Sequence, residues 1–482
     1  MLFPGKRGTP ARKRLLRASA TLVCAALLCS CANKSEKWRG VVDAPGKWNS
    51  AHGATKPLDT AALTKWWKRF NDPVLDTVIE KALTSSPDIK TALSRIAQYR
   101  GERSVQIAGL LPTVSGNASD RIQRRDEQST DLVTRSETAN LSLDMSWQID
   151  LFGRQMQNVA AATKDLEQNV ENYYAAQVTL TSDVATAYIT LRGTQKQLEV
   201  VRRNVESRKE TTDITRWQNE AGVNDALAVE QAVSTLELAK AAIPSLEQSI
   251  SESKNQIAVL CGQNPGTLDA LLDRSSKLPR VPASLAIGIP AEALSNRPDV
   301  QAAIDAVLAA YYRKTEAELQ RLPTIDLSGS IGLEALRTGT IFSPESAART
   351  LAGSLLASLA QPIFEGGRIT ANIHINEELA KQAVYAYQST AQTALSEVEN
   401  AMVAIRKLST RLEVLKKADR AAVEASKLAA LQYEAGEVDI LTVLDTQRTQ
   451  LSVEEQHASA ETDHLLAYVQ LYKSLGGGWQ NQ

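Results

Sequence analysis

The sequence predicts an α+β membrane protein in which very long helices alternate with pairs of β-strands. Three observations support this fold class. Blocks of sequence recur in the same order in both halves of the chain, one segment alternates apolar and polar residues, and two very long stretches contain almost no helix-breaking residue. A long internal repeat, strands with one apolar face and helices several times the usual length point away from one ordinary globular domain.

The two halves of the chain match each other in order. Ser86-Pro87-Asp88-Ile89 reappears as Arg297-Pro298-Asp299-Val300 at an offset of 211, and Glu220-Ala221-Gly222 reappears as Glu434-Ala435-Gly436 at an offset of 214. The increase in offset falls between two predicted strands, where a loop tolerates a change of length. We therefore expect a signal peptide (1–30), a lipidated N-terminal segment (31–86), a first repeat (87–261), a linker (262–297), a second repeat (298–475) and a C-terminal tail (476–482).

Each repeat is predicted to contain two strands, which makes four in the chain. The clearest runs from Asn140 to Asp150, where Leu141, Leu143, Met145 and further apolar residues alternate strictly with polar ones. This period of two gives a strand one apolar and one polar face. The other strands are expected near Thr113 to Gln123, Thr324 to Leu333 and Arg349 to Phe364.

A very long helix is predicted after each strand pair, over 154–221 and over 368–435, and Gly193 is the one breaker within them. At 1.5 Å per residue, each helix would extend about 100 Å. Apolar positions spaced by alternating steps of four and three predict packing against neighbouring helices, as in a coiled coil. Shorter helices are expected to return over 223–261 and 437–475.

Four glycines are predicted to mark turns. Gly222 and Gly436 should end the long helices, because glycine readily adopts the left-handed conformation at a helix C-terminus. Gly153 and Gly367 precede the long helices and should absorb the bend from strand to helix.

The first thirty residues are predicted to be a secretory signal peptide, because six basic residues precede a short apolar run from Ala18 to Leu28. The run is too short to cross a membrane, which takes about 20 apolar residues. Leu28-Cys29-Ser30-Cys31 resembles a bacterial lipobox, so Cys31 is expected to become the lipidated N-terminus. Cleavage before Cys31 would leave Cys261 as the other cysteine, and a single thiol cannot form an intramolecular disulfide.

The composition argues against several classes of function. A net charge of -1 carries no general preference for nucleic acid. The four histidines and four cysteines show no spacing typical of a metal site or a redox pair. No nucleophile elbow or phosphate-binding glycine loop is present either. We therefore expect no cofactor, no metal and no enzyme activity.

Four strands with one apolar face predict an assembly of several chains. An open sheet edge facing lipid leaves backbone groups without hydrogen bonds, and a closed barrel needs at least eight strands. Three chains would supply twelve strands and close a pore. Helices of about 100 Å exceed any bilayer, so the helical part is expected to stand in the periplasm as an α-helical barrel.

Several motifs resemble those of the TolC-like outer-membrane factors, in the lipoprotein branch that serves resistance-nodulation-division efflux systems. The resemblance covers nearly the whole mature chain. It rests on Trp66-Trp67-x-x-Phe70-x-Asp72-x-x-Leu75, Ile149-Asp150-Leu151-Phe152-Gly153-Arg154, Pro362-Ile363-Phe364-Glu365-Gly366-Gly367-Arg368 and Gly476-Gly477-Gly478-Trp479.

This resemblance implies a homotrimer in the cell outer membrane, with a 12-stranded β-barrel continuous with a periplasmic α-helical barrel. It implies a passive exit duct for drugs or other toxic small molecules. It also implies two partners, a periplasmic adaptor protein and an inner-membrane resistance-nodulation-division pump, besides the lipid of the outer membrane.

The family narrows its pore at the periplasmic tips of the helical hairpins, and here those tips are acidic. The residues expected to form the gate are Asp439, Asp445, Glu437, Tyr433 and Asp225. A threefold ring of carboxylates would favour cations. Helix capping by the same acids is the alternative, and the sequence leaves both roles open.

The tip glycines have a second implied role, because the family's adaptor is thought to contact this small-residue notch. Gly222 and Gly436 are therefore candidate adaptor contacts as well as turn residues. The chain also departs from the family pattern. Relatives often carry aspartate six residues past the tip glycine, where this chain has Ala228 and Thr442, so the family's gating contacts do not transfer intact.

Two other functions share parts of this pattern. The outer-membrane duct of a type I protein-secretion system has the same fold, although such ducts usually lack a lipobox. A structural coiled-coil lipoprotein that spaces the envelope would not need amphipathic strands. An efflux duct therefore fits the sequence better than either alternative.

Overall fold

The computed structural model describes residues 45–50, 63–127, 132–274, 277–282, 288–338 and 348–479. The predicted signal peptide and Cys31 lie outside this part of the chain. Two compact units make up the described residues. The strand unit takes its residues from Gln106–Ala160 and Tyr311–Glu377, and the helical unit from Val42–Val105, Ala161–Ala310 and Glu378–Gln482. Each unit thus draws segments from both halves of the sequence.

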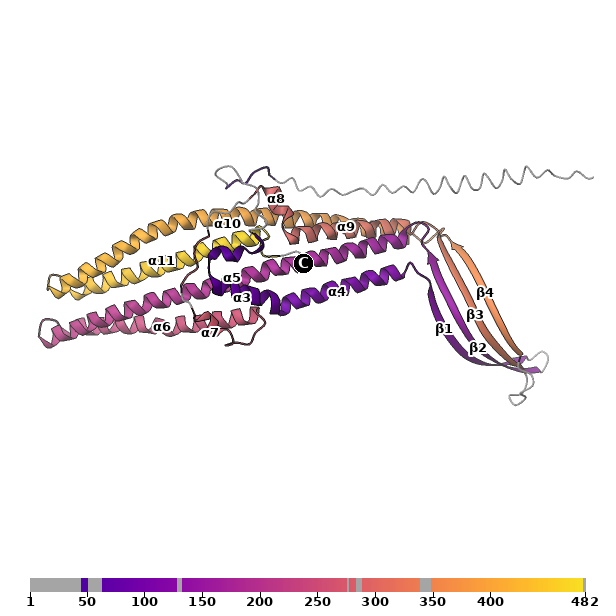
Figure 1. Cartoon of the computed structure of the whole chain (residues 1–482), viewed down its shortest axis with the longest axis horizontal. Coiled ribbons are helices and arrows are strands. Elements are labelled where there is room, and N and C mark those ends of the chain that lie inside the picture. Colours follow the sequence, from indigo (N-terminus) through magenta and orange to yellow (C-terminus); the bar gives the residue numbers. More distant parts are fainter. Residues whose placement is uncertain are drawn as a thin grey trace, which may run out of the picture. The chain divides into compact units, whose positions relative to one another are not determined.

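The strand unit contains one antiparallel sheet of four strands in the order β1-β2-β3-β4. The strands lie side by side (Figure 1) and comprise β1 (Thr113–Glu127), β2 (Leu132–Ile149), β3 (Thr324–Thr338) and β4 (Ala348–Ala360). The register pairs Leu141 of β2 with Leu333 of β3, and Leu333 with Leu351 of β4. Four strands were expected, and the structure confirms them. Within the described residues, β1 and β4 each keep one edge without a partner strand.

Several strand boundaries differ from the expectation, since β1 ends at Glu127 and β3 at Thr338, beyond the expected Gln123 and Leu333. The expected second strand begins at Asn140, whereas β2 begins at Leu132 and pairs with β1 from Leu132 to Ser146. The expected fourth strand continues to Phe364, whereas β4 ends at Ala360. Pro362 follows closely, and proline has no N–H to donate to a strand ladder.

The helical unit is dominated by two long hairpins (Figure 1). The first joins α5 (Arg154–Glu220) to α6 (Ala226–Leu260), and the second joins α10 (Arg368–Glu434) to α11 (Ile440–Ser474). Both long helices have 67 residues, and both return helices have 35. Each long helix is one residue shorter than expected, because Ala221 and Ala435 belong to the turns.

Shorter elements complete the described chain. They are η1 (Trp66–Phe70), α3 (Pro73–Ser85), α4 (Pro87–Ala108), α7 (Asp269–Leu272), α8 (Pro290–Ser295) and α9 (Pro298–Leu319). The helices α4 and α9 open the two repeats at equivalent places, and both have 22 residues. In the described part of the chain, no helix combines the length and the apolar character needed to cross a membrane.

An aromatic core holds the N-terminal segment against the helices. Trp66 and Trp67 are fully buried, and the Trp66 ring stacks on Tyr472 of α11 with a centroid distance of 5.0 Å. Phe70 packs edge-on against Trp66 and Tyr472. The paired tryptophans therefore serve core packing. Asp72 extends this core, because its carboxylate caps α3 and accepts a hydrogen bond from the Tyr188 hydroxyl of α5 at 2.8 Å.

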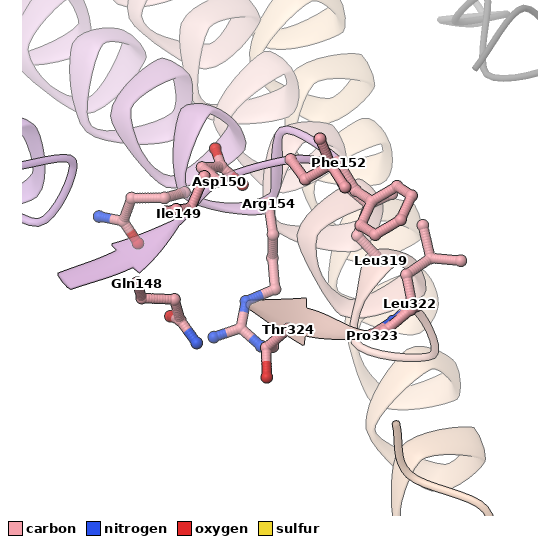
Figure 2. A pocket seen from close by; sticks show the side chains of 11 residues that line it. Gln148, Ile149, Asp150, Phe152, Arg154, Leu319, Leu322, Pro323 and Thr324 are labelled. Atoms are coloured by element: carbon pink, nitrogen blue, oxygen red, sulfur yellow. The ribbon is translucent and has the colours of Figure 1, made fainter. Parts of the chain in front are cut away.

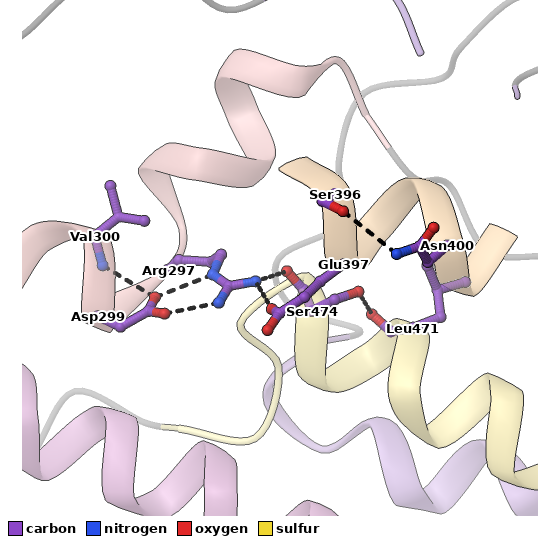
Figure 3. A network of polar contacts seen from close by, with 8 residues as sticks. All are labelled: Arg297, Asp299, Val300, Ser396, Glu397, Asn400, Leu471 and Ser474. Atoms are coloured by element: carbon purple, nitrogen blue, oxygen red, sulfur yellow. Dashed lines mark hydrogen bonds and ion pairs between the residues drawn. The ribbon is translucent and has the colours of Figure 1, made fainter. Parts of the chain in front are cut away.

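Arg297, at the start of α9, ties three segments together (Figure 3). Its guanidinium donates to the Ser474 carbonyl at 2.9 Å and pairs with Glu397 of α10 at 2.7 Å. It also pairs with Asp299 at 2.7 Å. The pKa of Arg297 is raised: burial alone would lower it, but the two carboxylates outweigh that effect. The beginning of α9 is thus fixed to α10 and to the end of α11.

The helices α5 and α11 lie close together at Gly193. A Cβ added there would lie 2.7 Å from Thr462 Cγ2 and 3.1 Å from Thr462 Cβ. Both distances are shorter than ordinary van der Waals contacts, so the absence of a side chain is what allows the helices to pack here. The sequence marks Gly193 as a helix breaker, but the structure uses it as a contact.

Candidate functional site

The two hairpin tips lie at equivalent places in the two halves and have the same backbone geometry. Gly222 and Gly436 have φ angles of 75° and 74°. The residue after each glycine donates its N–H to a carbonyl five positions back, Val223 to Gln218 and Glu437 to Gln432, both at 2.8 Å. This is a Schellman turn, and it confirms that the glycines end the long helices. Apart from the two flanking residues, no heavy atom of the described part of the chain lies within 4 Å of a Cβ added at either glycine, so each tip keeps an open notch.

Two of the expected gate carboxylates cap the return helices. Asp225 Oδ1 accepts from the Ala228 N–H at 2.9 Å. Asp439 Oδ1 accepts from the Thr442 N–H at 3.0 Å and from its hydroxyl at 2.9 Å. These hydrogen bonds lower the pKa of Asp439, and the bond from the Thr442 N–H has the largest effect. The carboxylate of Asp439 therefore stays charged. Ala228 and Thr442 thus supply the capped N–H at the positions where relatives often have aspartate.

The other acids of the tips point into solvent. Glu437 and Asp445 are not buried in the chain, and neither are Asp225 and Asp439 despite their hydrogen bonds. The structure therefore brings the four carboxylates to the two tips of one chain without packing any of them in its core. In a single chain they form a negatively charged surface at the tips.

Tyr433 joins the two hairpins at their tips. Its side chain is 5% exposed, and its hydroxyl accepts from Asn224 Nδ2 at 2.6 Å. The same hydroxyl shares a hydrogen bond with Thr215 Oγ1 at 3.2 Å. Around this link lies a small apolar cluster made by Ala228, Ala429, Tyr433, Ile440, Val443 and Leu444. A tyrosine of the second hairpin thus holds both the last turns of α5 and the tip loop of the first.

Polar contacts continue along the interface between the hairpins. Gln447 of α11 donates to Thr211 Oγ1 of α5 at 2.8 Å, and its own Oε1 is buried without a partner. Within the first hairpin, Arg208 of α5 is 6% exposed and donates to Asn204 Oδ1 of α5 at 2.6 Å and to the Thr235 carbonyl of α6 at 3.0 Å. Burial lowers the pKa of Arg208. Beside the apolar cluster, buried polar side chains thus add hydrogen bonds between α5 and α11 and between α5 and α6.

The strand-to-helix turns lie in the strand unit. Gly153 and Gly367, between strand and helix, have φ angles of 79° and 87°, which lie in the left-handed region that favours glycine. Figure 2 shows the small pocket of about 30 Å³ beside the first turn, with Arg154 and Phe152 among its lining residues. Arg154 Nε lies 3.6 Å from Glu316 Oε1 of α9.

Sequence reasoning missed most of the partners at the tips. Tyr433 was singled out, but Asn224 and Thr215 were not, because their contact with Tyr433 joins residues from opposite halves of the chain. The neighbouring Gln447 and Arg208 were missed as well. A polar residue at a core position of a coiled-coil pattern, such as Thr215, is the signal that could have pointed to this interface.

Comparison with known proteins fits this geometry. The family model described as outer membrane efflux protein matches residues 78–263 and 289–477. Nodulation protein T of Rhizobium leguminosarum bv. viciae is 29% identical over 464 residues, covering 95% of this chain and 93% of that protein. The probable efflux pump outer membrane protein TtgC of Pseudomonas putida is 28% identical over 441 residues, covering 90% of this chain and 89% of that protein.

Solved structures show the same architecture. The outer-membrane channel OprN superposes with a TM-score of 0.84 at 31% identity, covering 92% of this chain and 99% of that one. The open state of the Neisseria gonorrhoeae MtrE outer membrane channel gives a TM-score of 0.75 at 28% identity, with coverage of 91% and 97%. The resemblance noted in the sequence is thereby confirmed: the chain belongs to the outer membrane efflux protein family.

Proposed function

We propose that three copies of this outer-membrane efflux protein form one closed exit duct for drugs or other toxic small molecules. The observation that carries the proposal is the four-stranded sheet, in which the outer edges of β1 and β4 have no partner among the described residues. Such edges are unfavourable in lipid, and pairing β4 of one copy with β1 of the next removes them. Three copies of four strands give twelve, within the range of known barrels.

The apolar side chains of the sheet support the same arrangement. Leu351 and Leu355 of β4 are 70% and 73% exposed in the single chain, and Leu141 of β2 is 59% exposed. Apolar side chains exposed to this extent are expected to contact lipid or a neighbouring copy of the chain. Lipidation of Cys31, which the lipobox suggests, would add a second membrane anchor beside the barrel.

The hairpin tips are the proposed contact with a periplasmic adaptor, which would link the duct to an inner-membrane pump. The notches at Gly222 and Gly436 have room for a partner side chain, because none of the described residues beyond the flanking ones fills the space that a Cβ would take. Relatives named as efflux pump outer membrane proteins favour such an assembly.

We propose that the hydrogen bonds of Tyr433 between the two hairpin tips, called the tip link below, hold the duct closed. Tyr433 holds the first hairpin through Asn224 and Thr215, so breaking these bonds should let the hairpins separate. The tip carboxylates, chiefly Asp439 and Asp445 with Glu437 and Asp225 nearby, would form threefold rings around the opening. Carboxylate rings favour cations, and they repel one another, so a neutral link such as that of Tyr433 is needed to hold them together.

Assembly is tested by cross-linking in a background that carries Cys261→Ala. One cysteine is placed on β1 and a second is scanned along β4, and the matched control scans β3 instead. Oxidation should give dimers and trimers on denaturing gels for β1 with β4 and none for β1 with β3. A protein that stays monomeric at micromolar concentration in mild detergent, with its secondary structure intact, would contradict the strand-counting argument.

The gate is tested in planar bilayers. Tyr433→Phe should raise the conductance or the open probability, and Tyr385→Phe is the control, because Tyr385 lies on the same helix and is 65% exposed. Asp439→Asn keeps an oxygen for the helix cap, and combined with Asp445→Asn it should lower cation selectivity. Glu424→Gln removes one charge from an exposed site of α10 away from the tip. If Glu424→Gln lowers cation selectivity as much as the tip variant does, the tip carboxylates do not set the ion selectivity of the gate.

A further inference from the structure

The two faces of the four-stranded sheet differ in polarity. Side chains alternate between the faces along each strand, and residues paired in register share a face. One face, called the apolar face below, carries the odd-numbered residues of β2 from Leu141 to Ile149 and their partners, such as Leu333 and Leu351. The opposite face, called the polar face, carries Ser142, Asp144, Ser146 and Gln148 of β2.

Asp144 lies near the middle of the polar face. Its row crosses all four strands, and its partners in that row are serines, namely Ser115, Ser330 and Ser354. On the opposite face, the apolar rows extend along β2 from Leu141 to Ile149. At about 3.4 Å per residue this span is about 27 Å long, and known membrane barrels have an apolar band about 25 Å tall. The carboxylate therefore lies at the level where the other face of the sheet suits lipid.

Uncharged side chains of three strands hold the Asp144 carboxylate. Asn117 Nδ2 of β1 donates to its Oδ2, and so does Ser142 Oγ of β2 at 3.0 Å. The hydroxyl of Ser330 on β3, opposite Asp144 in register, donates as well. Because these donors carry no charge, they fix the position of the carboxylate without neutralising it.

The basic residues of the strands lie too far from Asp144 to neutralise it. Arg121 of β1 shares the polar face, but it pairs with Thr138, which is six residues from Asp144 along β2. This separation is about 20 Å at 3.4 Å per residue. Arg349 is the one charged residue of β4, and it lies in the row of Ala335 on the apolar side. A neighbouring copy that pairs its β4 with β1 would therefore bring no positive charge to the polar face.

We propose that Asp144 residues from three copies form an acidic ring inside the barrel, and that this ring favours cations over anions. A membrane barrel turns its apolar side chains to lipid, so the polar face lines the lumen. Rings of carboxylates are a known source of cation preference in pores. The ring is distinct from the carboxylates at the hairpin tips, which belong to the helical unit. This inference rests on the proposed assembly of three copies.

A cysteine at Ser146 reports the charge of the lumen without relying on conduction through the gate. Ser146 is exposed and lies on the polar face, two residues from Asp144. Full-length protein with Cys261→Ala and Ser146→Cys is placed in lipid nanodiscs and treated with a trimethylammonium-ethyl or a sulfonato-ethyl methanethiosulfonate. The readout is the ratio of the two reaction rates, each divided by the rate with a free thiol in the same salt. This ratio cancels any change in the thiolate fraction, because both reagents attack the same thiol.

Asp144→Asn should lower the ratio of cationic to anionic reaction by about twofold to tenfold at 0.01 M salt, where the Debye length is about 30 Å. At 1 M salt, where it is about 3 Å, the ratio should hardly change. Asp144→Ser should give the same fall, and it serves as the second variant if Asp144→Asn folds poorly. Asp144→Glu keeps the charge and should keep the ratio.

Two controls separate the ring from the assembly on which it rests. Asp120→Asn makes the same chemical change in the row of Ala139, on the apolar side, and should leave the ratio unchanged. Leu143→Cys places the reporter on the apolar face, where lipid should make it react much more slowly than Ser146→Cys. Equal reaction at the two faces would contradict the barrel and the ring together. A reactive Ser146→Cys whose ratio is the same with Asp144→Asn, or falls as much with Asp120→Asn, would overturn the ring alone.

Discussion

Replacing Gly193 by alanine should destabilise the protein, although alanine is the better helix former. The exchange gains about 1 kcal/mol in helix propensity. The new methyl group would lie 2.7 Å from Thr462 Cγ2, and overpacking of this kind costs about 1–3 kcal/mol. Thr462 cannot easily turn away, because its χ1 is stiff and its hydroxyl donates to the Ala458 carbonyl at 3.0 Å. We take the upper part of the range and expect a net loss of about 1–2 kcal/mol.

Thermal unfolding followed by circular dichroism, in one detergent for all variants, measures the effect. The midpoint of Gly193→Ala should fall by about 2–6 °C. Adding Thr462→Ala removes the clashing atoms and should restore the midpoint. Gly101 lies inside α4 with nothing within 4 Å of an added Cβ, so Gly101→Ala should be neutral or stabilising. A Gly193→Ala protein that melts at or above the unmodified protein would refute the close-contact argument.

Three further changes have expected outcomes. Burial, and to a lesser extent the charge of Asp305, raises the pKa of Glu171 from 4.5 to about 7. The contribution of Glu171 to stability is therefore full below pH 4.5 and is lost as the pH rises to 7. The melting temperature should fall between pH 5 and pH 8, and in Glu171→Gln this fall should be smaller by about 2 °C. Asp72→Ala removes the cap of α3 and leaves the buried Tyr188 hydroxyl without its acceptor, and it should cost about 2–4 kcal/mol in denaturant titrations. Arg297→Met leaves Glu397 and the Ser474 carbonyl without their donor and should increase proteolysis of the α8–α9 segment, whereas unchanged cleavage would show that the network does not hold α9.

The repeating elements were largely predictable because their patterns are local. The long helices follow from two stretches almost free of breakers, and their ends follow from Gly222 and Gly436. The strand from Asn140 follows from its strict alternation. Residues 132–139 lack that alternation, and they join β2 because β1 pairs with all of them and β3 pairs with 136–139. This is a tertiary effect that a period count does not detect.

The contacts between hairpins were not predictable, because they join residues far apart in the sequence. Tyr433 meets Asn224 only after both hairpins have packed, and Asp419 meets His457 only across the α10–α11 hairpin. For Asp225 and Asp439, the pattern left two roles open, and the structure places both as helix caps while leaving them unburied at the tips. A carboxylate can serve both roles, so sequence reasoning alone could not choose between them.

The central pairing of the sheet constrains how the chain can be made and delivered. Leu141 of β2 meets Leu333 of β3, which belongs to the other repeat, so this pairing must wait until the second half of the chain has been synthesised. Until then, the β1–β2 hairpin presents an apolar face and two unpaired edges, the features that promote aggregation. A nascent chain in transit therefore needs a chaperone that shields this hairpin, and truncation after the first half should leave a protein that aggregates instead of inserting into the membrane.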